Sequence, residues 1–255
     1  MYKISIQPEE IEKMPLGSFP GKIHVIDRPG IDFMRAVAYL GTQRIIGFDT
    51  ETRPVFSPGQ RHHHVALLQL SGGGKAYLFR VGTMGMSKLL CALLSNPHII
   101  KVGAAVQDDV RGLQYYRKFD AKGFVDLQKI AYEWGIRDKS VKKMAANILG
   151  VRISKSQQLS NWEAEELSAA QQMYAATDAW VCREMYLRLL QSEKHPLTPE
   201  ELNPPQPPQP SQAAQPKAEN AAPAAGDGKK KRRRRHRRKA KKPAAGQSQT
   251  QQDNG

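Results

Sequence analysis

The chain has 255 residues, of which 40% are hydrophobic and 25% charged, so it can bury one sizeable core with an appendage. Its two cysteines, Cys91 and Cys182, lie inside apolar helical patterns, which excludes a disulfide-dense secreted scaffold and predicts small buried side chains. The formal net charge of +15 favours a polyanionic partner, and because no run approaches the roughly 18 apolar residues of a membrane span, we expect a soluble, cytoplasmic protein.

Strand patterns dominate the first part of the chain, and helical patterns dominate the rest. The strand patterns are short runs rich in β-branched and aromatic residues, at 22–26, 44–51, 65–71, 76–81 and 99–105. The helical patterns occupy 86–96, 107–117, 124–134, 140–149 and 168–192. An early strand meander followed by helices predicts an α/β domain built on a mixed sheet.

The composition changes abruptly after the last helical pattern. The next segment is rich in Pro, Gln and Ala, which predicts a disordered linker, and the run Lys229–Lys242 behind it carries twelve Lys and Arg residues. Such a run repels itself and favours a polyanion, either as a nucleic-acid tether or, in a eukaryote, as a nuclear localisation signal. The expected division is an N-terminal extension at 1–21, a folded domain at 22–195, a disordered linker at 196–228 and a disordered basic tail at 229–255.

The strand pattern ending in GFDTE places two acids close together. Asp49 and Glu51 are two residues apart on a strand, so their side chains point to the same face. Two carboxylates at the end of a buried strand repel one another and lose hydration, and a cation would offset that cost. The alternative is a solvated strand end.

Two further acidic motifs follow. Asp108 and Asp109 open a helical pattern after an apolar strand, where acids also simply complement the helix dipole. In MYAATDAW, Tyr174 and Asp178 are four residues apart and share a helix face, which is also compatible with a tyrosine at the core edge beside a solvated acid.

In this order, the three motifs resemble the DEDD superfamily of 3′→5′ exonucleases, in the subclass with tyrosine in the third motif. Asp49 and Glu51 correspond to its first motif, Asp109 to its second, and Tyr174 with Asp178 to its third. The flanking segments are also similar to the Werner-type and RNase D-type branches, namely VALLQLS, FVDL, LSNWE and YAATDA. The resemblance spans roughly residues 22–192.

The resemblance implies a ribonuclease H-like α/β fold in which four carboxylates hold two divalent ions. Hard oxygen donors favour Mg²⁺ or Mn²⁺. By this likeness Asp49 would bridge both ions, Glu51 and Asp178 would complete one site, and Asp109 would hold the second ion mainly through water. Tyr174 would orient the attacking water, because a phenol with a pKa near 10 is a poor base at neutral pH.

Weaker candidates lie near these motifs. Arg53 follows the first motif and is a candidate for contact with the substrate backbone, as is Lys155. The basic run Lys229–Lys242 is a third candidate contact. The tract His62–His64 is expected to be a solvated loop, because consecutive side chains on extended backbone alternate in direction and do not converge on one ion.

The sequence therefore predicts a metal-dependent 3′→5′ exonuclease that releases nucleoside 5′-monophosphates from single-stranded or frayed 3′ ends. The similarity to the Werner-type branch favours DNA as the substrate, and the similarity to the RNase D-type branch favours RNA. We expect DNA to be preferred. A non-catalytic nucleic-acid binder anchored by its basic tail is the rival, although such a relative would be expected to lack one of the acids.

Overall fold

The computed structural model describes residues 1–57, 59 and 62–203, which belong to a compact unit, Met1–Pro207. The basic run Lys229–Lys242 and residues 204–228 of the expected linker lie outside the described residues.

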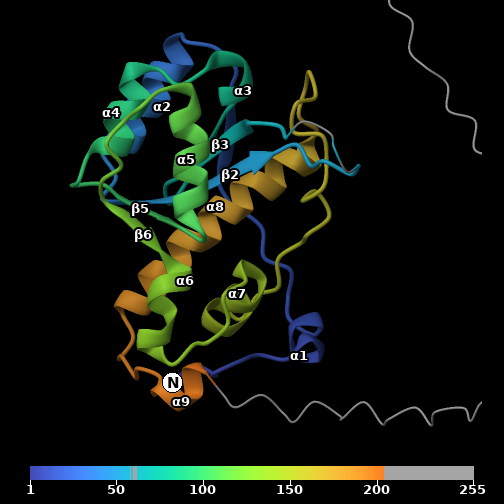
Figure 1. The fold of residues 1–255 in the computed structure, drawn as a ribbon, viewed down its shortest axis with the longest axis vertical. Coiled ribbons are helices and arrows are strands. Elements are labelled where there is room, and N and C mark those ends of the chain that lie inside the picture. The colour runs from blue at the N-terminus through green and yellow to red at the C-terminus, as the bar shows by residue number, and fades with distance from the viewer. Residues whose placement is uncertain (58, 60–61, 204–255) are drawn as a thin grey trace, which may run out of the picture. The chain divides into compact units, whose positions relative to one another are not determined.

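A six-stranded mixed sheet forms the centre of this unit (Figure 1), in the order β1-β4-β3-β2-β5-β6. Strands β2, β3 and β4 form an antiparallel meander, whereas β1 pairs with β4, β5 with β2, and β6 with β5 in parallel. The strands are β1 (Lys22–Ile26), β2 (Ile45–Thr52), β3 (Val65–Ser71), β4 (Lys75–Phe79), β5 (Ile100–Gly103) and β6 (Phe124–Asp126).

Helices cover both faces of the sheet (Figure 1). One core cluster joins helices α2, α4 and α5 to the sheet, and a second joins α6, α7 and α8 to β5. The helices are α1 (Pro8–Glu12), α2 (Ile31–Gly41), α3 (Val81–Met84), α4 (Lys88–Ser95), α5 (Val106–Tyr116), α6 (Leu127–Ile130), the 3₁₀-helix η1 (Ala131–Trp134), α7 (Val141–Leu149), α8 (Ala169–Leu190) and α9 (Pro199–Leu202).

Strand β2 lies between these two helical layers, and its side chains point alternately toward one layer and the other. Ile46 and Phe48 are fully buried in the cluster with α2, α4 and α5. Gly47 faces α8 so closely that an added Cβ would lie 1.8 Å from the carbonyl oxygen of Ala179. Since Asp49 and Glu51 follow Gly47 at spacings of two residues, they share its face and lie against α8.

The expected mixed α/β architecture is confirmed, but the helix predicted over 124–134 is wrong at its start. Phe124–Asp126 form strand β6, and the Asp126 carboxylate then caps helix α6 by accepting from the backbone N–H of Gln128 at 3.0 Å. A strand of three residues is too short to show a period of two, so the run merges with the helix after it. Helix α2 was absent from the expected elements.

Packed structure extends beyond the expected domain at both ends. In the presumed N-terminal extension, Ile6, Ile11 and Phe19 are each 2% exposed, and the N–H of Ile6 donates to Asp138 Oδ2 at 2.8 Å. After the last long helix, the N–H of Leu197 donates to the carbonyl of Tyr132 at 3.0 Å, and α9 follows. Across residues 1–57, 59 and 62–203, no helix has the length and apolar character needed to span a membrane.

Candidate active site

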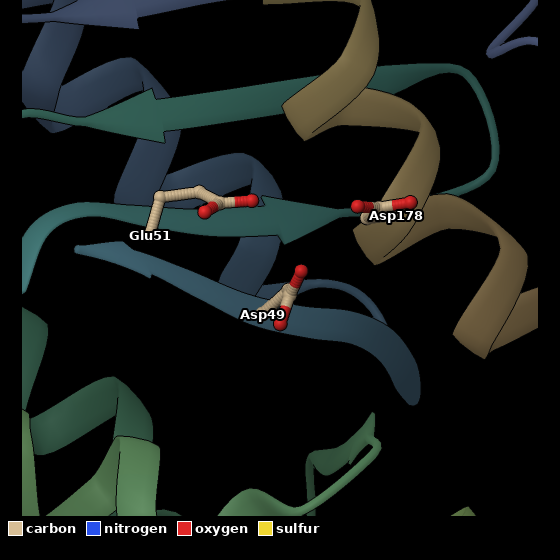
Figure 2. Close-up of side chains that lie close together, drawn as sticks. All are labelled: Asp49, Glu51 and Asp178. Carbon is tan, nitrogen blue, oxygen red and sulfur yellow. The ribbon is translucent and has the colours of Figure 1, made fainter. Parts of the chain in front are cut away.

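Three carboxylates meet where helix α8 crosses strand β2. Asp49 and Glu51 project from β2 and Asp178 from α8, and one oxygen of each lies within 4.8 Å of the others (Figure 2). The close approach at Gly47 and the small side chains of Ala175 and Ala179 bring the helix against the strand. All three acids remain partly exposed, so the cluster is open to a ligand.

Asp109 on α5 is not one of the three clustered carboxylates, and it is linked to β2 through Thr50, which lies between Asp49 and Glu51. Thr50 Oγ1 donates to Asp109 Oδ1 at 2.6 Å, and the charge of Asp109 raises the pKa of both Asp49 and Glu51. Its neighbour Asp108 points elsewhere, because its side chain is 81% exposed and pairs with Arg111 at 2.9 Å.

Burial disfavours the ionised form of each carboxylate, and for Asp49 and Glu51 the charges of neighbouring acids add to it. Burial, followed by the charges of nearby acids, raises the pKa of Asp49 well above its usual value and that of Glu51 to about 9. Burial raises the pKa of Asp109 to about 6 despite the hydrogen bond from Thr50. Burial also raises the pKa of Asp178 to about 7, although hydrogen bonding with Tyr174 and the charge of Lys155 favour its ionised form.

Tyr174 lies one helical turn before Asp178. Burial, then the negative charges of Asp178 and Glu51, raise the pKa of its phenol, so the hydroxyl keeps its proton at neutral pH. The ring packs against Trp162, with 5.9 Å between the ring centroids. A protonated phenol held in place can orient a ligand by hydrogen bonding but cannot accept a proton as a general base.

A cavity of about 290 Å³ opens over the acids. It is lined by Asp49, Glu51, Tyr174 and Asp178, with Lys142 and Lys155 also at its wall. Lys142 is ion-paired to Glu12 at 2.9 Å, and Lys155 is exposed and acts electrostatically on Asp178. Of the weaker candidates, Lys155 is therefore beside the carboxylates.

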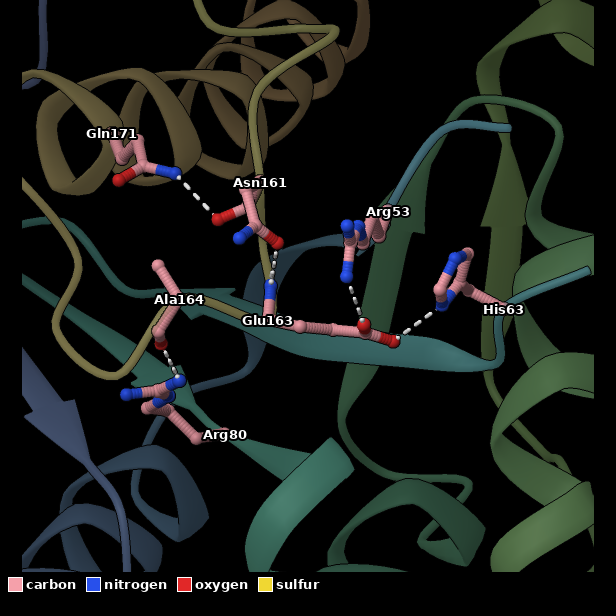
Figure 3. Close-up of polar contacts among 7 residues, drawn as sticks. All are labelled: Arg53, His63, Arg80, Asn161, Glu163, Ala164 and Gln171. Carbon is pink, nitrogen blue, oxygen red and sulfur yellow. Dashed lines mark hydrogen bonds and ion pairs between the residues drawn. The ribbon is translucent and has the colours of Figure 1, made fainter. Parts of the chain in front are cut away.

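Arg53 has a different environment. Its guanidinium pairs with Glu163 at 3.3 Å, and the other carboxylate oxygen of Glu163 contacts His63 Nδ1 at 2.9 Å (Figure 3). Glu163 thus ties the segment after β2 and the segment before β3 to the loop preceding α8. The motif LSNWE contains this glutamate, but nothing local in that motif indicated the partners that the fold supplies.

The structure also adds residues that the sequence patterns did not single out. Thr50 reaches Asp109, and Trp162 supports Tyr174. Gln69 is fully buried and stands opposite Asp49 in the register of β2 and β3. Only Thr50 has a local signal in the sequence. It lies between Asp49 and Glu51 on a strand, so its side chain points to the opposite face from theirs, where it can contact another element.

The donor set fits divalent cations. The clustered ligand atoms are all carboxylate oxygens, the hard donors that Mg²⁺ and Mn²⁺ prefer. The raised pKa values of the four acids show that their negative charges lack sufficient compensation from the protein, and a cation would supply it.

Comparison with known proteins gives a consistent result. A family model described as 3'-5' exonuclease matches residues 32–192. The bifunctional 3'-5' exonuclease/ATP-dependent helicase WRN of Mus musculus is 31% identical over 204 residues, which are 73% of this chain and 14% of that protein. Ribonuclease D of Gluconacetobacter diazotrophicus is 30% identical over 129 residues, 50% of this chain and 33% of that protein. The chain thus spans a third or less of the length of either relative.

A solved structure supports the fold. RNase D of Trypanosoma brucei in complex with RNA U12 matches with a TM-score of 0.60 at 21% sequence identity, over 69% of this chain and 64% of that one. The mixed sheet with helices on both faces is accordingly ribonuclease H-like.

Proposed function

The chain belongs to the 3′-5′ exonuclease family of hydrolases, and we propose that it removes nucleotides from the 3′ ends of single-stranded or frayed nucleic acid with two divalent ions, Mg²⁺ or Mn²⁺. The observation that carries the proposal is the gathering of Asp49, Glu51 and Asp178 within 4.8 Å, with Asp109 tied to the same strand through Thr50.

Each residue of the site has a role in this proposal. Asp49, Glu51 and Asp178 would hold the cations at the junction of β2 and α8, and Asp109 would contribute from α5. The ions, when bound, supply a water of lowered pKa and charge stabilisation at the phosphate. Tyr174 orients the attacking water through its hydroxyl oxygen, and Lys155 at the cavity wall attracts the phosphate backbone.

The reaction is a hydrolysis. A water oxygen forms a bond to the last internucleotide phosphorus, and the bond from that phosphorus to the 3′ oxygen of the preceding nucleotide breaks. The 3′ oxygen leaves with a proton, so the products are a nucleoside 5′-monophosphate and a strand shorter by one nucleotide.

We propose DNA as the preferred substrate and RNA as the alternative. The match to the Werner-type exonuclease and helicase extends over 73% of the chain, whereas the match to ribonuclease D extends over 50%. The solved relative bound to RNA U12 is the observation in favour of RNA.

The basic run Lys229–Lys242 is proposed to act as a tether for nucleic acid, joined by the Pro-rich linker to an exonuclease domain. Its twelve Lys and Arg residues favour binding to phosphates without sequence preference.

The experiment compares matched 5′-labelled DNA and RNA strands in Mg²⁺, Mn²⁺ and excess EDTA, with Asp178→Asn as the inactive control. We expect a ladder of products shortened from the 3′ end, faster on DNA, and none with EDTA or with the variant. Full activity in EDTA would contradict the metal site, while faster cleavage of RNA would reverse the substrate assignment.

A further inference from the structure

A second cavity of about 530 Å³ lies beside the candidate active site. It is formed by the segment before β3, the end of α5, helix α3 and the loop before α8. Aromatic side chains make up much of its lining, namely His62, His63, His64, Tyr115, Tyr116 and Trp162.

Two of these rings form a stack at the surface. His64 and Tyr115 lie 3.6 Å apart between centroids with an interplanar angle of 13°, and Tyr115 is 59% exposed. Tyr116 holds the pair from the side, since its ring is edge-on to Tyr115 and its hydroxyl donates to the carbonyl of Val65 at 2.7 Å. An exposed pair of stacked rings, supported at its side by Tyr116, is the kind of surface on which a nucleobase stacks.

The cavity adjoins the carboxylate centre through one aromatic contact. Trp162 lines the second cavity, Tyr174 lines the catalytic one, and the two rings touch at 5.9 Å. A strand whose 3′ end occupies the catalytic cavity therefore has the second cavity as a neighbouring place for another of its bases.

The charge of the cavity permits a phosphate backbone to approach. Among the described residues that line it, Glu163 is the one acid, and that carboxylate is already engaged by Arg53 and His63 (Figure 3). Arg80 adds a cation, and its guanidinium donates to the carbonyls of Ala164 and Glu165, which fixes the loop that carries Trp162.

We propose that this cavity binds a nucleobase of the cleaved strand, on the 5′ side of the scissile phosphodiester, by stacking on the His64–Tyr115 pair. The inference rests on the proposed function, because it names where a second nucleotide of the same substrate is held. The terminal nucleotide occupies the carboxylate cavity, so the stacked base belongs to the part of the strand that remains after cleavage.

The test compares full-length Tyr115→Ala with Tyr132→Ala, which removes another exposed tyrosine, on η1, that lines neither cavity. The substrates are a labelled oligonucleotide and the p-nitrophenyl ester of thymidine 5′-monophosphate, which has no second base. Tyr115→Ala should raise the ratio of the oligonucleotide KM to the ester KM about 5- to 150-fold, as expected for one lost base stack, and Tyr115→Phe should restore the wild-type ratio. Tyr132→Ala should leave the ratio unchanged.

A binding measurement locates the stacked base. Oligonucleotides carrying 2-aminopurine at successive positions from the 3′ end should show quenching at one internal position with the wild-type protein, and Tyr115→Ala should relieve it. An unchanged KM ratio for Tyr115→Ala, or quenching only of a base in the complementary strand, would overturn the proposal. If wild-type protein hydrolysed neither substrate, the proposed function would fail. The quenching measurement would still decide whether a nucleobase stacks in the second cavity.

Discussion

At the scale of single residues, the site depends on which of two adjacent acids, Asp108 or Asp109, faces the strand that carries Asp49 and Glu51. Asp109 contacts Thr50 between Asp49 and Glu51, whereas Asp108 turns outward to Arg111. Neighbours on a helix are about 100° apart, so both acids cannot serve the same centre.

Exchanging each acid for its amide separates their roles. Asp109→Asn should lower turnover by orders of magnitude while substrate binding is largely kept, since it removes a ligand charge. Asp108→Asn should stay active and lose about 0.3–1 kcal/mol of stability, the usual contribution of an acid at a helix N-terminus. Steady-state kinetics and thermal unfolding of both variants provide the measurement, and an inactive Asp108→Asn beside a normal Asp109→Asn would contradict the assignment.

Glu51 predicts a dependence of stability on pH. Because the pKa of Glu51 rises from 4.5 to about 9 on folding, the native protein holds this proton more tightly than the unfolded chain. The stability gained from that proton is complete below pH 4.5 and is lost as pH rises toward 9. Without metal, the melting temperature should fall over this window.

The matched variant is Glu51→Gln, which cannot ionise. At pH 8 without metal it should melt roughly 3–8 °C above the wild type, and it should lose most of the stabilisation by Mg²⁺ or Mn²⁺. Thermal scans with and without metal at pH 5, 7 and 9 measure both effects. A wild-type protein whose melting temperature rises steadily with pH would contradict this account.

At the scale of elements, the site depends on how closely α8 approaches β2. Gly47→Ala would place a methyl group 1.8 Å from the carbonyl oxygen of Ala179, so the helix must shift and carry Asp178 away from Asp49. We expect a loss of about 1–3 kcal/mol in stability and a loss of activity even at temperatures where the variant is folded. Gly41→Ala, whose Cβ would meet nothing within 4 Å, is the control and should be neutral in both measurements.

The elements differ in how well local sequence predicts them. Helix α8 and strand β2 were predicted within a few residues, because a long apolar helical pattern and a continuous β-branched run leave little choice. Helix α2 begins after Gly30 with no side-chain cap, and it was missed. Strand β6 has three residues and is stabilised by pairing with β5. The local sequence around β6 does not indicate that pairing.

The site shows the same division between local and long-range information. The sequence motifs predicted which acids form the site, because each motif is a pattern of residues at a fixed short spacing. The contacts of Thr50 with Asp109, and of Glu163 with Arg53, join residues separated by 59 and 110 positions, so they depend on sheet register and loop path. Such contacts follow from the complete fold.

At the scale of the whole molecule, the basic run should govern binding and leave the chemistry alone. A chain truncated after Asn203 should bind long strands more weakly and with a flatter salt dependence, since fewer phosphates are contacted. Its turnover on saturating short substrates should stay near that of the full chain. Affinity measured from about 50 to 200 mM salt decides this, and equal affinity of both proteins at every salt concentration would exclude a tether.

The packed residues before β1 and between α8 and Asn203 set limits on where the chain can be cut. A fragment reduced to residues 32–192 would lack β1, and β4, which is largely buried, would become an open sheet edge able to pair with another molecule. It would also uncover Ala146 and its neighbours on α7, now packed against Ile6 and Ile11, and α7 borders the catalytic cavity. If such a fragment self-associates or has a less ordered catalytic cavity, the removal of these packed residues would be the cause. Biochemical work should therefore retain the chain from Met1 to at least Asn203.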